Sequence, residues 1–161
     1  MVPTTTVAET RAIDAALAAA DVMLGVAARS VLEVEDLVST PQLRVLMLIA
    51  ASGPQNLGAV AAELDVHPSN ATRTCEKLVQ AGLIVRSDHP DDRRFIHLEL
   101  TEAGSDLVDH VLAQRRRAIA EVFAQLAEDD RGPVASAFER FVEAAGGVPS
   151  HDGRFAFGLH F

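Results

Sequence analysis

Stretches in which apolar residues return every three or four positions alternate along this chain with short stretches rich in Gly, Pro, Ser and Asn. This pattern predicts a mainly helical fold. The predicted helices span residues 7–37, 42–51, 57–64, 68–82, 101–126 and 129–145. The second begins after Ser39-Thr40-Pro41, which offers a hydroxyl cap and a first-turn proline. The fourth opens with Pro68 and is stopped by Gly82.

Between residues 83 and 100 the period changes to that of a strand. Leu83-Ile84-Val85-Arg86 is strand-like, and residues 95–100 alternate apolar and polar side chains, as a half-buried strand does. His89-Pro90-Asp91-Asp92 forms the loop between them. The fold class is therefore mainly α with a small β-hairpin wing. The helices at 57–64 and 68–82 form a helix-turn-helix that the hairpin follows.

The helix at 68–82 has two chemically different faces. Ala71, Cys75, Leu78 and Val79 form an apolar stripe, and the opposite face carries Ser69, Asn70, Thr72, Arg73, Glu76 and Lys77. Base edges are contacted by such groups, because Asn pairs well with adenine, Arg pairs well with guanine, and Ser or Thr serve bases or phosphates. Taken alone, the polar face is more simply a solvated helix surface.

The hairpin changes this interpretation. Arg93 and Arg94 follow an acidic turn at its tip, where a purely structural role is hard to justify. An extended arginine suits a narrow, electronegative minor groove. Asp92 is expected to pair with an arginine, for example Arg86, and so fix the loop. Together, the helix and the hairpin predict a protein that binds duplex DNA. The helix would lie in the major groove and the hairpin tip in the adjacent minor groove.

The net charge of −9 argues against DNA only until its distribution is considered. Residues 67–98 hold five basic and four acidic groups, so this segment carries +1 and the remainder −10. A locally basic face on an acidic body binds phosphate while directing the body away from it. The charge pattern therefore predicts a specific, salt-sensitive binder.

The segment VHPSNATRTCEKLVQAGLIVRSDHPDDRRFIHLELTEAG resembles the winged-helix core of MarR-family transcriptional regulators. The resemblance rests on three segments. They are the Asp-Arg-Arg wing, the Ala81-Gly82-Leu83-Ile84 turn, and the segment 100–104 through which the chain leaves the hairpin. It implies an obligate homodimer, a palindromic operator in double-stranded DNA and, in many members, a small-molecule or redox effector. The implied organisation is one domain over 1–161, with a DNA-binding core at 40–100, dimerisation helices at 7–37 and 101–146, and a tail at 147–161.

The resemblance also implies roles for single residues. Ser69, Asn70, Thr72 and Arg73 correspond to major-groove contacts, and Arg94 to the minor-groove contact. Arg93 supports the wing or a phosphate. Thr40 and Pro68 mark helix starts near phosphates, and Lys77, Arg86 and Asp92 complete the expected DNA-binding set.

The resemblance further implies an effector pocket between the dimerisation helices and the core, and we expect a small anionic, lipophilic ligand there. The residues placed near it are Val22, Met23, Val26, Arg29, Arg44, Met47 and His110. The alternative is that most of these side chains belong to the core. The tail carries Phe155, Phe157, Leu159 and Phe161 in alternation, which either adds to the dimer interface or forms a free end.

Other chemistries find little support. Cys75 lies on the apolar stripe, so a buried structural thiol is favoured over a redox sensor. The six histidines show no metal-ligand spacing, and no nucleophile-base pair or phosphate-binding glycine loop suggests an enzyme or a cofactor. Charged residues near the N-terminus interrupt any signal peptide, so we expect a cytoplasmic protein without a membrane span. The alternative function is a winged-helix interaction module that does not grip DNA.

Overall fold

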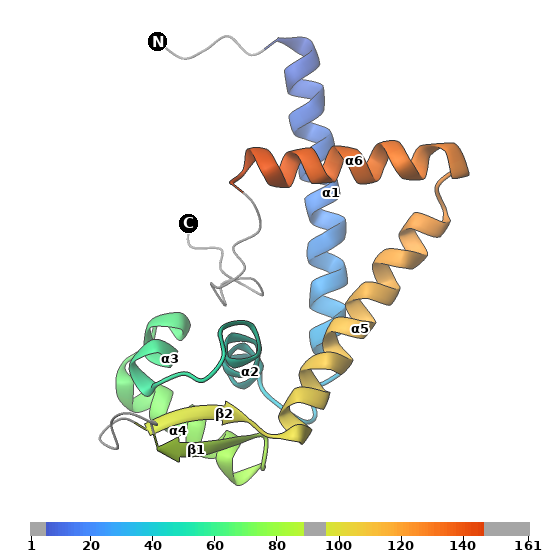
Figure 1. Cartoon of the computed structure of the whole chain (residues 1–161). Helices are drawn as coiled ribbons and strands as arrows, with labels where there is room; N and C mark the ends of the chain where they lie inside the picture. Colours follow the sequence, from blue (N-terminus) through green and yellow to red (C-terminus); the bar gives the residue numbers. More distant parts are fainter. Residues whose placement is uncertain (1–5, 89–95, 147–161) are drawn as a thin grey trace, which may run out of the picture.

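The structure is a computed structural model that describes residues 6–88 and 96–146. These residues form six helices and one two-stranded antiparallel hairpin (Figure 1). The elements are α1 (Val7–Leu32), α2 (Thr40–Ser52), α3 (Leu57–Leu64), α4 (Pro68–Gln80), β1 (Ile84–Asp88), β2 (Ile96–Leu100), α5 (Glu102–Ala124) and α6 (Glu128–Ala144). The expected fold class is confirmed, and most predicted element ends lie within two or three residues of the observed ones.

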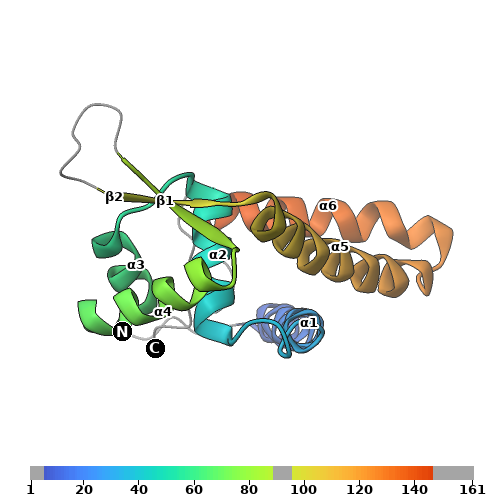
Figure 2. The same cartoon turned by 90° about the horizontal axis from the view of Figure 1, so that it is seen from below.

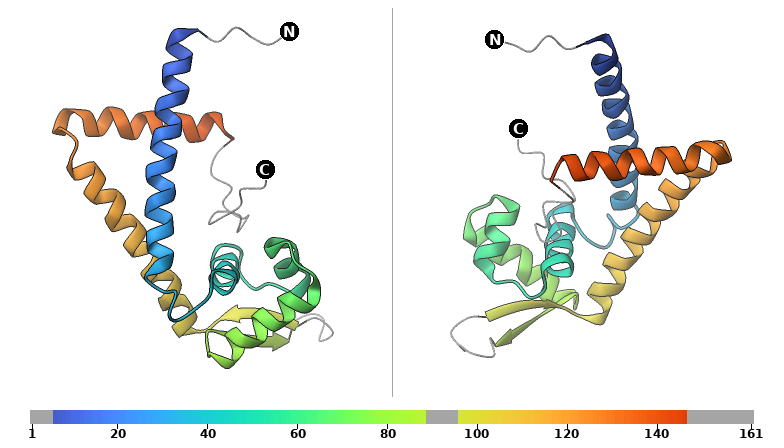
Figure 3. Two further views of the ribbon diagram at one scale, coloured as in Figure 1. Left: turned by 180° about the vertical axis from the view of Figure 1, so that it is seen from behind. Right: turned by 45° about the horizontal axis from the view of Figure 1, so that its top comes forward.

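The molecule has two parts, a lobe and a group of long helices. α2, α3, α4 and the hairpin gather into a lobe, while α5 rises from the end of β2 and α6 crosses α1 far from that lobe (Figure 1). Seen from below, α3 and α4 lie on one side of α2, and α1, α5 and α6 lie on the other (Figure 2). The two further views show the same separation (Figure 3).

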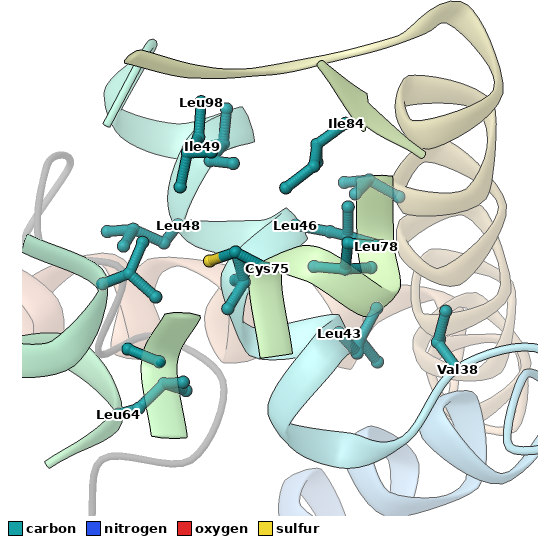
Figure 4. Close-up of a cluster of buried hydrophobic side chains, with 14 of the residues drawn as sticks. Val38, Leu43, Leu46, Leu48, Ile49, Leu64, Cys75, Leu78, Ile84 and Leu98 are labelled. Carbon is teal, nitrogen blue, oxygen red and sulfur yellow. The ribbon is translucent and has the colours of Figure 1, made fainter. Parts of the chain in front are cut away.

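The lobe is held together by an apolar core that α2, α3, α4, β1 and β2 all supply. Leu46 of α2, Leu78 of α4 and Leu98 of β2 are fully buried (Figure 4). Val108 and Val111 extend the same cluster into the first half of α5. The apolar stripe predicted on the fourth helix is confirmed, because Ala71, Cys75 and Leu78 are all buried in this core.

The first helix ends at Leu32 and not at residue 37, so the predicted end is wrong. Acidic residues follow at Glu33, Glu35 and Asp36. Negative charge at the C-terminal end of a helix opposes its dipole, so continuation there is unfavourable. The chain instead makes tight turns, with the N–H of Val34 donating to the Val31 carbonyl at 3.1 Å. These turns bury Val34 and Val38 against the lobe.

The hairpin is anchored to the helix-turn-helix. β1 and β2 pair antiparallel, with Arg86 opposite Leu98. Gln55, just before α3, exchanges backbone hydrogen bonds with Leu98 at 3.0 and 2.7 Å. The base of the hairpin is therefore fixed relative to α3, which makes the hairpin an extension of the lobe.

The turn between α3 and α4 contains the one non-glycine residue with a positive φ in the described part of the chain. Asp65 has φ 52° and ψ 51°, the left-handed conformation, at the end of α3. Aspartate tolerates this region better than most residues, and a β-branched side chain tolerates it badly. The turn that orients α4 thus depends on the side chain at this position.

We expect Asp65→Val to lower the free energy of unfolding by about 1–2 kcal/mol, because its Cβ branches crowd the backbone at positive φ. Asp65→Gly is the matched control and should stay within about 0.5 kcal/mol of the wild type. Urea denaturation followed by circular dichroism measures both. Equal midpoints for the two variants would contradict the expectation.

Residues on either side of the hairpin meet where α5 begins. The N–H of Thr101 donates to the Leu83 carbonyl at 3.1 Å, and its hydroxyl donates to the Gly82 carbonyl at 2.6 Å. The same hydroxyl oxygen accepts the N–H of Gly104 at 3.1 Å and caps α5. A Cβ on Gly104 would overlap with the carbonyl oxygen of Leu83. Only glycine lets α5 approach the lobe this closely.

Helices α1 and α6 expose far more apolar surface than the lobe does. α6 has no fully buried residue, and α1 buries only Val26 and Ser30. Ile13, Leu17 and Leu24 are exposed on α1, and Phe141 of α6 is 64% exposed. By length and composition alone, α1 is long and apolar enough to cross a membrane. The core helix of a soluble protein meets the same two criteria.

Candidate nucleic-acid interface

The polar face of α4 points away from the lobe. Ser69, Asn70, Arg73 and Lys77 are exposed, and Thr72 is partly buried at the flank of this face. The side chains of Asn70, Arg73 and Lys77 form no hydrogen bond or ion pair with any residue that the structure describes. The helix therefore presents two donors with positive charge and one amide that are all available to a ligand. An amide and an arginine three residues apart lie on the same helical face.

The N-terminal turn of α4 is organised by a residue that the sequence reasoning overlooked. His67 is the N-cap, and its Nδ1 accepts the N–H of Ser69 at 3.3 Å and lies 2.9 Å from the Ser69 hydroxyl. The Thr72 hydroxyl donates to the Pro68 carbonyl at 2.9 Å. Histidine is an uncommon cap, so only its place directly before Pro68 signalled this role.

The wing-side residues are only partly placed. Arg86 of β1 lies 3.9 Å from the carboxylate of Glu76 on α4, with both side chains exposed. This pair links α4 to the hairpin. Asp92, Arg93 and Arg94 lie outside the residues that the structure describes, so the expected pairing of Asp92 with Arg86 stays a prediction. Thr40 is exposed at the first turn of α2.

The residues expected at an effector pocket lie in several surroundings, and their role stays a prediction. Val22, Met23 and Val26 line a small apolar cleft of about 180 Å³ among α1, α5 and α6. Arg29 lines an adjoining cleft between α1 and α5, which Val26 lines as well. The Nε2 atom of His110 lies 3.8 Å from a carboxylate oxygen of Glu33.

The remaining two expected effector residues belong to the lobe. Arg44 of α2 donates to the backbone carbonyl of Glu63 on α3 and lies 3.4 Å from its carboxylate. Met47 packs against the buried core. Arg44 thus connects two helices of the lobe, and Met47 fills space beside them. Whether either residue also contacts an effector stays a prediction.

No group of three or more His, Cys, Asp or Glu side chains in the described ranges is arranged to hold a metal ion. The one cysteine, Cys75, is fully buried on the inner face of α4, as predicted. Burial raises the pKa of the Cys75 thiol to about 11. The reactive thiolate is therefore scarce at neutral pH.

We expect iodoacetamide to alkylate native Cys75 at pH 8 at least about 100-fold more slowly than the urea-unfolded chain. The raised pKa lowers the thiolate fraction, and burial blocks the reagent as well. Mass spectrometry of quenched time points measures both rates. Similar rates in the two states would show that the thiol is accessible and reopen a sensor role.

Comparison with known proteins agrees with this geometry. The model of the MarR family matches residues 38–96. The HTH-type transcriptional repressor MdtR of Bacillus subtilis is 32% identical over 108 residues, which cover 67% of this chain and 70% of MdtR. The crystal structure of RV1404 from Mycobacterium tuberculosis is 35% identical, has a TM-score of 0.69, and is matched over 86% of this chain and 95% of that one.

A more distant structure shows the same fold. The transcriptional regulator Tm0710 of Thermotoga maritima is 22% identical, with a TM-score of 0.73 over 84% of this chain and 95% of that chain. The likeness extends well beyond the segment that the family model matches. The long helices at both ends of the chain are therefore part of the shared fold.

Proposed function

The chain belongs to the MarR family of DNA-binding transcriptional regulators, which are not enzymes, and we propose that it is a cytoplasmic repressor that binds a palindromic operator as a homodimer. The observation that carries this proposal is the polar face of α4, where Asn70, Arg73 and Lys77 have no partner among the described residues. The relative MdtR is itself named a repressor.

In the proposed complex α4 enters the major groove. Asn70 and Arg73 contact base edges, while Ser69, Thr72 and Lys77 contact bases or phosphates, with Thr40, Pro68 and Arg86 near the DNA backbone. Arg93 and Arg94 reach the minor groove, steadied by Asp92. The hydrogen bonds between Gln55 and Leu98 support this arrangement, because they fix the base of the wing beside the helix-turn-helix.

The homodimer is proposed to form through α1, α5 and α6. An open apolar groove of about 550 Å³ lies between α1 and α6, lined by alanines of α1 and by Phe138 and Phe141 of α6. Apolar patches of this kind on a soluble protein mark contact surfaces. A second copy related by two-fold symmetry would cover both helices and place two recognition helices about 34 Å apart.

Release from the operator is proposed to follow binding of a small ligand that favours a dimer with displaced recognition helices. Such a ligand acts only through its differential affinity for the two arrangements. Val22, Met23 and Val26 are proposed to contribute an apolar wall, because they already line a cleft where α1, α5 and α6 meet. Arg29 supplies positive charge on the neighbouring surface of α1.

Selection from a pool of random duplexes at near-physiological salt tests the proposal. The expected result is an inverted repeat whose half-sites are centred about one helical turn apart. The double variant Arg93→Ala/Arg94→Ala, run in parallel, should fail to enrich it. Absence of any motif, with binding that is purely salt-driven, would contradict the proposal and favour a winged-helix module that binds another protein.

A further inference from the structure

The turn that begins α4 is held by one residue through both its side chain and its backbone. Pro68 occupies the first helical position and has no N–H, so the first free amide of the helix is that of Ser69. This N–H donates to Nδ1 of His67 at 3.3 Å, and the carbonyl of His67 accepts the N–H of Asn70 at 2.9 Å. The imidazole is therefore fixed against the first turn of the helix that carries the proposed DNA contacts.

These contacts select one tautomer of the neutral imidazole ring. Nδ1 must present a lone pair to accept the N–H of Ser69, so the proton of the neutral ring lies on Nε2. With a proton on Nδ1, two hydrogens would face each other, and the first amide of α4 would lose its cap. His67 is thus held in the tautomer whose Nδ1 can only accept hydrogen bonds.

The tautomer in turn fixes the direction of the Ser69 hydroxyl. Its oxygen lies 2.9 Å from Nδ1 of His67, which is shorter than the contact between the Ser69 amide and the same nitrogen. Because Nδ1 carries no hydrogen, the hydroxyl is the donor, and its one proton is used inside the protein. His67 and Ser69 are both exposed, so the remaining lone pairs of this oxygen are available to a ligand. Toward a ligand, Ser69 therefore acts as an acceptor only.

We propose that His67 makes Ser69 an acceptor-only contact that reads the amino group of adenine or cytosine in the major groove. The proposal rests on the DNA binding proposed above and adds the class of base at one position. In the major groove only the N6 amino group of adenine and the N4 amino group of cytosine donate a hydrogen bond, whereas guanine and thymine present acceptors there. A phosphate oxygen also requires a donor, which Ser69 does not offer. His67 is thus a positioning residue that acts through Ser69.

The tautomer is tested first, without DNA. Long-range nitrogen–proton NMR spectra at pH 8 report which nitrogen of each neutral imidazole carries the proton. The variant His67→Gly removes the signals of His67 and so assigns them among the six histidines. The expected spectrum shows an unprotonated Nδ1 and a protonated Nε2. A protonated Nδ1 would overturn the proposal, whatever the behaviour toward DNA.

The base preference is tested by selection from random duplexes with the wild type, Ser69→Ala, His67→Gly and the matched control Thr74→Ala. Glycine is itself an accepted N-cap, so His67→Gly should keep α4 folded, which circular dichroism verifies. It removes the acceptor and so frees the hydroxyl proton of Ser69. Thr74→Ala removes a hydroxyl of the same helix that donates to the Asn70 carbonyl at 3.0 Å.

In the wild type, one half-site position should favour adenine or cytosine over guanine and thymine by at least about fivefold, and Ser69→Ala should abolish that preference. His67→Gly should weaken it at the same position, because a free hydroxyl also donates to the acceptors of guanine and thymine. Thr74→Ala should leave it unchanged. An operator in which no position responds to Ser69→Ala, or whose preference there survives in His67→Gly, would overturn this inference alone. Absence of any operator would contradict the proposed function as well, so the two failures are distinguishable.

Discussion

Replacing Gly104 with alanine is expected to destabilise the protein by about 3 kcal/mol or more, a large effect for the addition of one methyl group. The new Cβ would overlap with the carbonyl oxygen of Leu83 and would lie 3.0 Å from its carbonyl carbon. Neither atom belongs to a side chain that could rotate away, so the backbone itself must move. The Leu83 carbonyl also accepts the N–H of Thr101, so this hydrogen bond would be strained as well.

Gly104→Ala should also weaken DNA binding. α5 leaves the lobe at Gly104, directly after the wing, so a shift there separates the DNA-binding lobe from the long helices. Thermal unfolding and operator affinity of Gly104→Ala are the two measurements. Gly132→Ala serves as control, because nothing lies within 4 Å of a Cβ at Gly132 on α6. That control should be neutral or slightly stabilising, by up to about 1 kcal/mol. Equal stability of both variants would show that the junction is not as tight as described.

This junction also shows what the sequence could and could not predict. The exit at 100–104 and the turn at 81–84 were each readable, because Gly82 and Thr101 have strong local preferences for helix ends. Gly82 indeed adopts φ 70°. That the two segments touch depends on the hairpin folding back between them, and no periodicity encodes such a contact. The need for glycine at position 104 follows from packing alone.

The same distinction separates the proposed DNA-binding residues from the proposed effector-binding residues. A helix face is fixed by spacing, so the stripe of Ala71, Cys75 and Leu78 could be read directly, and with it the opposite polar face. A pocket assembled from α1, α2 and α5 depends on how these helices cross. Arg44 illustrates the difference, since its partner Glu63 belongs to another helix and no spacing along the sequence indicates that pairing.

A run of charged residues says even less about where each of its side chains lies in the fold. Arg115, Arg116 and Arg117 are indistinguishable by composition, yet the structure buries part of the first and exposes the other two. The reason is that position 115 shares a helical face with Val108 and Val111, which are buried in the core. A reading that followed this apolar stripe along α5 would have singled out Arg115. Ser30, whose hydroxyl accepts hydrogen bonds from Arg115, lies on α1, far away in the sequence. No pattern in the sequence indicates that these two residues meet.

Arg73→Ala is expected to cost about 1–3 kcal/mol of specific operator binding for each recognition helix, or roughly 5- to 150-fold. Arg73 is exposed on α4, has no partner among the described residues, and lies in the second turn after the capped N-terminus. An arginine in that place makes a two-point contact with guanine, and its loss leaves the base edge unpaired. Discrimination between operator and unrelated duplex should therefore fall.

Lys77→Ala provides the contrast on the same face. Lys77 is also exposed and unpaired among the described residues, but it lies one turn further from the N-terminal end of α4, which is the end proposed to enter the groove. If Lys77 meets phosphate, its removal weakens operator and unrelated duplex alike and reduces the salt dependence by about one counterion. Titrations of both duplexes at several salt concentrations separate the two behaviours. A uniform loss in Arg73→Ala would assign Arg73 to the phosphate backbone and move sequence readout to Asn70 and the wing.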